Sequence, residues 1–288
     1  MTNKAQGKME AIVVGAPGSA DPTERFGFGK NWAQFLTVLN ESRIDEAVKS
    51  LKEKLNVTDL NSRVFLDIGS GSGLFSLAAS RLGATVHSFD YDTDSVACTQ
   101  YLKDYYGAKD AVWTVEQGSV LDKQFLEKFP KADIVYSWGV LHHTGHMIEA
   151  FENVATRVKD GGRLFISIYN DQGRASRHWT WVKKAYIEKG PFIRWLLTLY
   201  VLLNGWTITF IKDLLKGNPL KTWRQYGDNN RGMSAMHDVV DWVGGYPFEV
   251  ATPELVFNFF AVRKYSLLFL KTCGGGLGCN EFVFVKNQ

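Results

Sequence analysis

The sequence predicts an α/β protein built on a doubly wound, mostly parallel sheet of seven strands, with an N-terminal helical segment and a helical insertion after strand 5. Short apolar segments alternate with segments of helical spacing between residues 64 and 169, which is typical of a parallel sheet. A glycine-rich turn follows the first apolar segment, as in open sheets that bind ligands at their carboxyl edge. The 288 residues suffice for one large domain with an insertion.

The N-terminal part, residues 1–58, is expected to be a leader followed by a helical cap. Apolar side chains recur at helical spacing from Trp32 to Leu55. Met1–Glu10 is polar and lacks the apolar core of a signal peptide. The three cysteines are odd in number and match no common zinc spacing, which favours a reducing compartment. We therefore expect a cytoplasmic protein.

The core, residues 59–170, is expected to contain five strands joined by helices. The strands are Val64–Ile68, Thr85–Phe89, Ala111–Glu116, Asp133–Trp138 and Arg163–Tyr169. The helices are Leu74–Leu82, Asp94–Tyr106, Leu121–Phe129 and Met147–Val158. After an insertion over 171–250, the segment 251–288 is expected to complete the core with a helix and a strand pair, Pro253–Ala261, Ser266–Lys271 and Glu281–Val285.

The most specific motif is the turn Asp67-Ile68-Gly69-Ser70-Gly71-Ser72-Gly73 between the first strand and its helix. Glycines let the backbone approach a ligand closely, and a helix N-terminus offers free N–H groups. The spacing G-x-G-x-G departs from the G-x-G-x-x-G of dinucleotide sites. Asp90 ends the second strand, where a carboxylate can accept hydrogen bonds from ribose hydroxyls of a dinucleotide or of another nucleoside. The pattern predicts a nucleoside site, with a plain tight turn as the alternative.

Four segments together resemble the successive motifs of class I S-adenosylmethionine-dependent methyltransferases, over roughly residues 60–170. They are Val64–Gly73, Thr85–Asp90, Asp133–His143 and Gly161–Ile168. The nearest subgroup is the ubiquinone-biosynthesis-type small-molecule O-methyltransferases. The resemblance implies S-adenosylmethionine as the cofactor and a Rossmann-like methyltransferase fold.

The resemblance also implies which residues hold the cofactor. Asp67 would fix the cofactor's amino group, Asp90 would take the ribose hydroxyls, and Ser119 replaces an acid that usually reads the adenine. Arg43 would pair with the cofactor carboxylate, or else be an exposed helix charge. The full set is Arg43, Asp67, Gly69, Ser70, Gly71, Gly73, Asp90, Tyr91, Ser119, Val120, Ser137 and Trp138.

Two polar clusters are candidates for proton transfer from the acceptor. Leu141-His142-His143-Thr144-Gly145-His146 follows the fourth strand, and we expect His143 or His146 to be the base. The alternative is a packing element that walls the cofactor. No acidic ligand cluster accompanies these histidines, so a metal site is not expected.

The second cluster runs from Asp228 to Trp242. His237 and Asp241 are four residues apart and would share a helix face, as a base and its orienting acid. We expect Arg231 and Trp242 to contact the substrate. The alternative is a capped, solvated helix start.

The insertion combines positive charge with an apolar stretch. Residues 171–224 hold ten basic and three acidic residues, and 195–211 is mostly apolar. This stretch is shorter than the roughly 20 residues of a membrane span. We expect a buried helix pair or lid, or alternatively a peripheral membrane contact through 183–224.

The function expected from these features is methyl transfer to an O or N atom of a small, hydrophobic acceptor. The net charge of +3 is too small to require a nucleic-acid partner, and the basic residues are interleaved with apolar runs, so none is expected. The alternatives are an RNA or protein methyltransferase, or a non-catalytic cofactor-binding protein.

Overall fold

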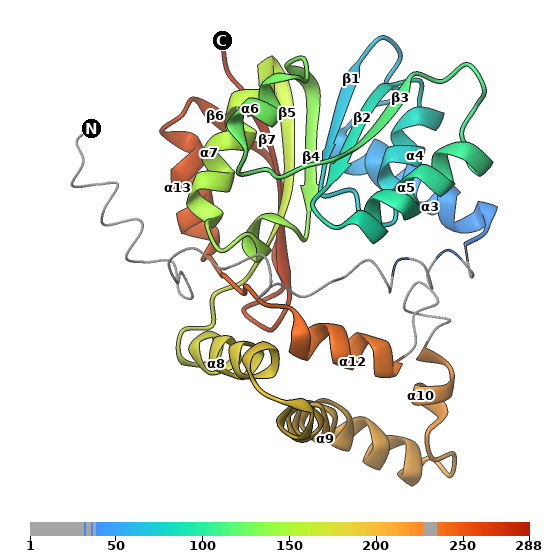
Figure 1. Cartoon of the computed structure of the whole chain (residues 1–288), viewed down its shortest axis with the longest axis vertical. Helices are drawn as coiled ribbons and strands as arrows, with labels where there is room; N and C mark the ends of the chain where they lie inside the picture. Colours follow the sequence, from blue (N-terminus) through green and yellow to red (C-terminus); the bar gives the residue numbers. More distant parts are fainter. Residues whose placement is uncertain (1–31, 33–35, 37–38, 227–234) are drawn as a thin grey trace.

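The computed structural model describes residues 32, 36, 39–226 and 235–288, and it contains the predicted seven-stranded sheet (Figure 1). The strand order is β3-β2-β1-β4-β5-β7-β6. Strands β1 to β5 pair in parallel, whereas β7 lies antiparallel between β5 and β6. The strands are β1 Val64–Ile68, β2 Thr85–Asp90, β3 Trp113–Gln117, β4 Ala132–Trp138, β5 Val158–Tyr169, β6 Tyr265–Lys271 and β7 Cys279–Lys286.

Helices cover both faces of the sheet (Figure 1). One face carries α3 Glu41–Leu55, α4 Leu74–Arg81 and α5 Thr93–Tyr106. The other carries α6 Lys123–Glu127, α7 Met147–Arg157 and α13 Pro253–Ala261. Each layer buries its own apolar cluster against the strands, around Leu51 on the first face and Phe260 on the second. Burial of these clusters from water is the main force that holds the layers together.

Side-chain caps set where several helices begin. Asn40, Asp92, Asp122 and Thr252 each accept a hydrogen bond from a backbone N–H of the first turn of α3, α5, α6 and α13. Strand β5 begins at Val158, five residues earlier than predicted, because Val158 already pairs with Ala132. The strand then passes an irregularity in register before regular pairing resumes at Arg163.

The predicted insertion is helical. It consists of α8 Arg174–Glu188, α9 Pro191–Leu215, α10 Lys221–Arg224 and α12 Ala235–Gly244. These helices form a separate layer beside one end of the sheet, with α12 nearest to the strands and α9 farthest away (Figure 1). They share a small apolar core around Trp179, Val201 and Val243.

Candidate functional site

A cavity of about 800 Å³ lies at the carboxyl ends of β1, β2 and β4, where the strand order reverses. The core contributes most of the predicted cofactor residues, and the insertion closes one side. The predicted residues that line the cavity are Asp67, Gly69, Ser70, Gly71, Asp90, Tyr91, Ser119, Val120, Trp138, His143, Asp241 and Trp242.

The first strand–helix turn is shaped by glycines in the left-handed region. The N–H groups of Gly69 and Ser70 both donate to the carbonyl of Phe89, at 2.9 and 3.1 Å. Gly69 has φ +78°, and a Cβ there would lie 2.5 Å from both methyl carbons of Val140. Only glycine fits this position, since a side chain would meet both backbone strain and a filled site.

Gly73 packs against a neighbouring helix. It does not line the cavity, and a Cβ at this position would lie 2.8 Å from the Cα of Thr99. Gly73 therefore permits close packing of α4 on α5. Its predicted contact with the cofactor stays a prediction, because glycines in one turn can serve either a ligand or a neighbouring helix.

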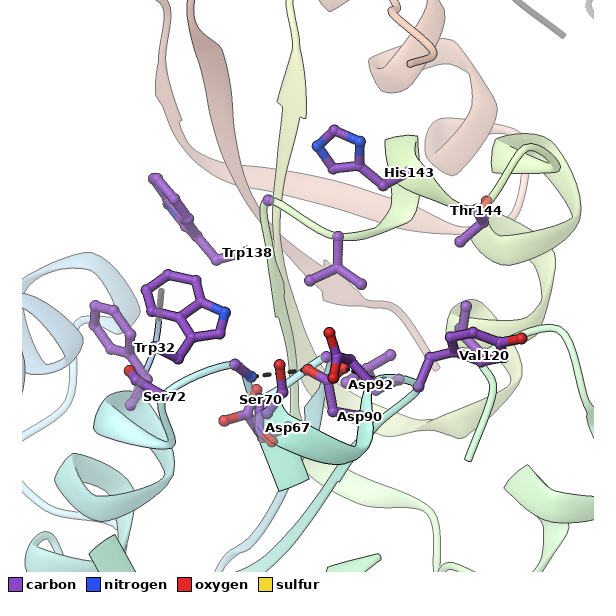
Figure 2. Close-up of a pocket in the computed structure, with 18 of the residues that line it drawn as sticks. Trp32, Asp67, Ser70, Ser72, Asp90, Asp92, Val120, Trp138, His143 and Thr144 are labelled. Carbon is purple, nitrogen blue, oxygen red and sulfur yellow. Dashed lines mark hydrogen bonds between the residues drawn. The ribbon is translucent and has the colours of Figure 1, made fainter. Parts of the chain in front are cut away.

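Asp90 is held by the backbone at the edge of the cavity. Its Oδ2 accepts a hydrogen bond from the N–H of Gly71 at 2.9 Å, and its Oδ1 accepts one from Asp92 at 2.9 Å (Figure 2). Burial raises the pKa of Asp90 to about 6. Each carboxylate oxygen has a second lone pair, so the fixed carboxylate can still accept from two hydroxyls.

Asp67 is buried beneath the glycine turn. Its Oδ2 accepts a hydrogen bond from Ser76 Oγ at 2.5 Å, and Ser76 is joined to Ser88 at 2.6 Å. Burial raises the pKa of Asp67 to about 7, and the nearby charge of Asp90 acts in the same direction. A bound cation would offset both effects and favour the ionised carboxylates.

His143 faces the cavity across from Ser70 and Asp90, with Trp138 to one side (Figure 2). Its Nδ1 lies 2.7 Å from the carbonyl oxygen of Pro247. A carbonyl can only accept, so Nδ1 carries the proton and Nε2 is a proton acceptor. Burial lowers the pKa of His143 to about 4, which keeps the ring neutral at physiological pH.

Two other predicted residues are placed away from the cavity. Ser137 is completely buried, and its Oγ donates to the carbonyl of Ile68 at 2.9 Å, so it joins β4 to β1. His146 precedes α7 at its N-cap position and does not line the cavity. Neither residue is among those that line the cavity, so the roles expected of them stay predictions.

The cavity is acidic. Five aspartates line it: Asp67, Asp90, Asp92, Asp238 and Asp241. Among the described residues that line it there is no lysine or arginine. Aromatic rings make up much of the remaining wall, contributed by Trp32, Tyr91, Trp138, Tyr169, Trp242 and Tyr246. Carboxylates and aromatic faces both attract cations and disfavour a phosphate-rich ligand.

A family model described as a methyltransferase domain matches residues 39–205, more than half of the chain. The chain belongs to the methyltransferase domain family. A curated relative, the ribosomal protein L11 methyltransferase of Methylococcus capsulatus, is 29% identical over 183 residues, which are 63% of this chain and 51% of the relative. The chain therefore spans about half the length of that relative.

Solved methyltransferase structures are similar to this domain at low sequence identity. Magnesium protoporphyrin IX methyltransferase from Synechocystis, solved with bound S-adenosylhomocysteine (SAH), is 14% identical to this chain. The match covers 99% of this chain and 95% of that chain, with a TM-score of 0.48. An O-methyltransferase family protein from Burkholderia thailandensis is 13% identical, with 85% and 58% covered and a TM-score of 0.44. The family assignment depends on the domain match.

A second pocket of about 400 Å³ adjoins the first cavity of this methyltransferase domain. It lies between α9 and α12, where Asn204, Gly205 and Trp206 form one wall. Both cavities are lined by Tyr169, Asp238, Asp241, Trp242 and Leu277. The two spaces are therefore adjacent, with Asp241 and Trp242 at the boundary.

Lys183 of α8 is buried beside the cavity, which the sequence did not indicate. It is fully buried, and its Nζ donates to the carbonyl of Trp242 and lies 4.0 Å from the centre of the Trp242 ring. Burial lowers the pKa of Lys183 to about 7, while Asp241 opposes this shift. Lys183 thus orients the Asp241–Trp242 wall, and it cannot take part in the membrane contact predicted for 183–224.

Three further predicted residues do not contribute to the described cavity wall. Arg43 lies on α3 outside the cavity lining, but its Nη1 is buried with no hydrogen-bond partner among the described residues. Arg231 lies in 227–234, outside the described residues. His237 belongs to α12, and its side chain is outside the described part of the structure.

Proposed function

We propose that this methyltransferase uses S-adenosylmethionine to methylate an O or N atom of a small, hydrophobic acceptor. The observation that carries the cofactor assignment is the acidic, aromatic cavity at the glycine turn. S-adenosylmethionine carries a sulfonium and an ammonium, which five aspartates would attract. The diphosphate of a nicotinamide dinucleotide would be repelled by the same carboxylates.

The residues at the turn fit the parts of this cofactor. Asp90 offers two fixed carboxylate oxygens for the ribose hydroxyls. Tyr91 is exposed into the cavity beside Asp90 and would flank the adenine, with Ser119 and Val120 on the next loop. Arg43, whose Nη1 has no partner among the described residues, remains a candidate to pair with the cofactor carboxylate.

The chain's residues would position the acceptor and take up its proton. The bound cofactor supplies a methyl group already activated by its sulfonium. Orientation of the acceptor in line with that group accounts for most of the rate, and a neutral base removes the acceptor proton. His143 Nε2 is suited to this role because Nδ1 is committed to Pro247. Asp241 and Trp242, which line the same cavity as His143, would contact the acceptor.

The acceptor class is inferred from the second pocket. Its wall includes Val201, Trp206, Val239 and Trp242, so a largely apolar compound would fill it. The named activity of the Methylococcus capsulatus relative raises the alternative of a protein acceptor. The same fold could also serve an RNA acceptor, or bind the cofactor without catalysing a reaction.

Calorimetry tests the cofactor. We expect the purified chain to bind S-adenosylmethionine and S-adenosylhomocysteine and to give no heat with a nicotinamide dinucleotide. Incubation of a cell extract with the chain and methyl-labelled cofactor then tests the acceptor. Label in the small-molecule or lipid-soluble fraction supports the proposal, whereas label in protein or RNA replaces it. Cofactor binding with no labelled product in any fraction would indicate a non-catalytic binding protein.

A further inference from the structure

Helix α9 exposes a wide apolar face to solvent. Only 6% of its most apolar 18-residue window is buried. Six of its exposed apolar residues recur three, four or seven positions apart, so they share one side of the helix. They are Ile193, Leu196, Tyr200, Leu203, Phe210 and Leu214, and Leu203 and Leu214 are 57% and 53% exposed. Further exposed apolar side chains widen this face: Phe192, Trp195, Ile208, Ile211 and Leu215.

The other side of α9 is committed to the protein. Val201 is buried in the apolar core shared with α8 and α12. Asp213 is also buried, and its carboxylate accepts from the N–H and the hydroxyl of Thr222 at 2.7 and 2.8 Å. Among the described helices, α9 alone is long and apolar enough to cross a membrane by length and composition. Because it is packed on one side, α9 can lie along a membrane surface but cannot cross it as a separate span.

The charges around the apolar face are basic. Lys189 precedes α9, Lys212 lies in its last turn, and Lys216 and Lys221 follow it, all exposed. The acid within the helix, Asp213, is buried and hydrogen-bonded, and Glu188 pairs with Lys184 at 3.4 Å. A second copy would bring the same positive charges together, whereas anionic lipid headgroups would neutralise them.

We propose that α9 docks along an anionic membrane surface and that a lipophilic acceptor enters from the bilayer through the pocket between α9 and α12. Asn204, Gly205 and Trp206 of α9 form a wall of that pocket, and Tyr169, Asp241 and Trp242 connect it to the cofactor cavity. The delivery of the acceptor rests on the proposed methyl transfer, whereas the docking of α9 does not.

Co-sedimentation with vesicles tests the docking. The full chain is mixed with vesicles of phosphatidylcholine alone or with phosphatidylglycerol added. We expect binding to the anionic vesicles, weakening as salt is raised. The double variant Leu203→Glu/Phe210→Glu should lose at least about tenfold in vesicle affinity, because it places charges on the embedded face. A matched control, Tyr105→Glu/Val262→Glu, alters apolar residues that are 73% and 62% exposed elsewhere and should bind as the unmodified chain does.

A charge variant gives an independent measurement if the α9 double variant unfolds. Lys212→Gln/Lys216→Gln/Lys221→Gln should weaken binding to anionic vesicles several-fold and reduce its salt dependence. The proposal is overturned if the unmodified chain does not sediment with anionic vesicles, or if the charge variant binds unchanged. It is also overturned if light scattering shows a dimer that the Leu203/Phe210 change dissociates, since a second copy would then cover α9.

Cofactor calorimetry on the same preparations separates the two proposals. A chain that binds vesicles but not S-adenosylmethionine retains the docking surface and refutes the proposed function. A chain that binds the cofactor but not vesicles supports the cofactor assignment and refutes the docking of α9. Faster labelling of a lipid-soluble compound carried in vesicles than of a water-soluble acceptor would support entry from the bilayer. Equal labelling of the two would oppose it.

Discussion

Replacing Gly69 by alanine should destabilise the protein through two separate effects. The residue has φ +78°, and an L-residue held in this left-handed region costs about 1–2 kcal/mol. The new Cβ would also lie 2.5 Å from both Val140 methyl carbons, and overpacking of this kind costs about 1–3 kcal/mol. We therefore expect Gly69→Ala to lower the free energy of unfolding by about 2–5 kcal/mol.

Gly139 provides a matched control for the backbone effect. It has the same φ of +78°, but a Cβ there would have no neighbour within 4 Å. Gly139→Ala should therefore cost only the backbone strain, about 1–2 kcal/mol. In a double-mutant cycle, Val140→Ala should restore part of the overpacking cost of about 1–3 kcal/mol, because it removes both methyl groups at 2.5 Å but keeps the Val140 Cβ at 2.9 Å.

Urea denaturation followed by tryptophan fluorescence measures these differences, and calorimetry measures the affinity for S-adenosylmethionine. Gly69→Ala should also weaken cofactor binding by tenfold or more, since the displaced turn lines the cavity. The reasoning fails if Gly69→Ala is no more destabilising than Gly139→Ala, or if Val140→Ala gives no recovery in the double variant.

Three further predictions concern Asp90, His143 and Lys183. Asp90→Asn leaves one backbone N–H without its acceptor, so the cofactor Kd should rise about 10- to 100-fold by calorimetry, equivalent to roughly 1.4–3 kcal/mol; an unchanged Kd would contradict the assigned role. His143→Gln should lower kcat about 10²-fold or more with the cofactor Kd unchanged. In the unmodified enzyme the acid limb of kcat should follow the lowered pKa of His143, about 4, and a limb near 6.5 would refute the assignment. Lys183 has its pKa lowered from 10.5 to about 7, so between these values the unfolded chain binds a proton that the folded chain lacks. The free energy of unfolding should therefore rise with pH from about 7 toward 10, and in Lys183→Met this rise should disappear. An equal change in the urea midpoint between about pH 7 and pH 9 in the two proteins would exclude the effect.

The order of strands and helices was predictable because it depends on local patterns. β1 and α13 have the predicted ends, since an apolar run bounded by turn residues and a Thr-Pro start are local signals. Strand β5 was predicted too short, because the pairing of Val158 with Ala132 joins residues 26 apart in the sequence. Long-range pairing of this kind leaves no local pattern.

The residues of the site also fall into those that local sequence predicts and those that only tertiary contacts place. The sequence by itself determined the glycine turn and Asp90, because a strand, a turn and a helix N-terminus are contiguous and place these groups at one edge of the sheet. Only the tertiary structure decided that Ser137 and Gly73 serve packing, that Lys183 is buried beneath Trp242, and that α9 is exposed. The burial of a side chain depends on which distant elements cover it, and helical spacing alone cannot distinguish a covered face from an open one.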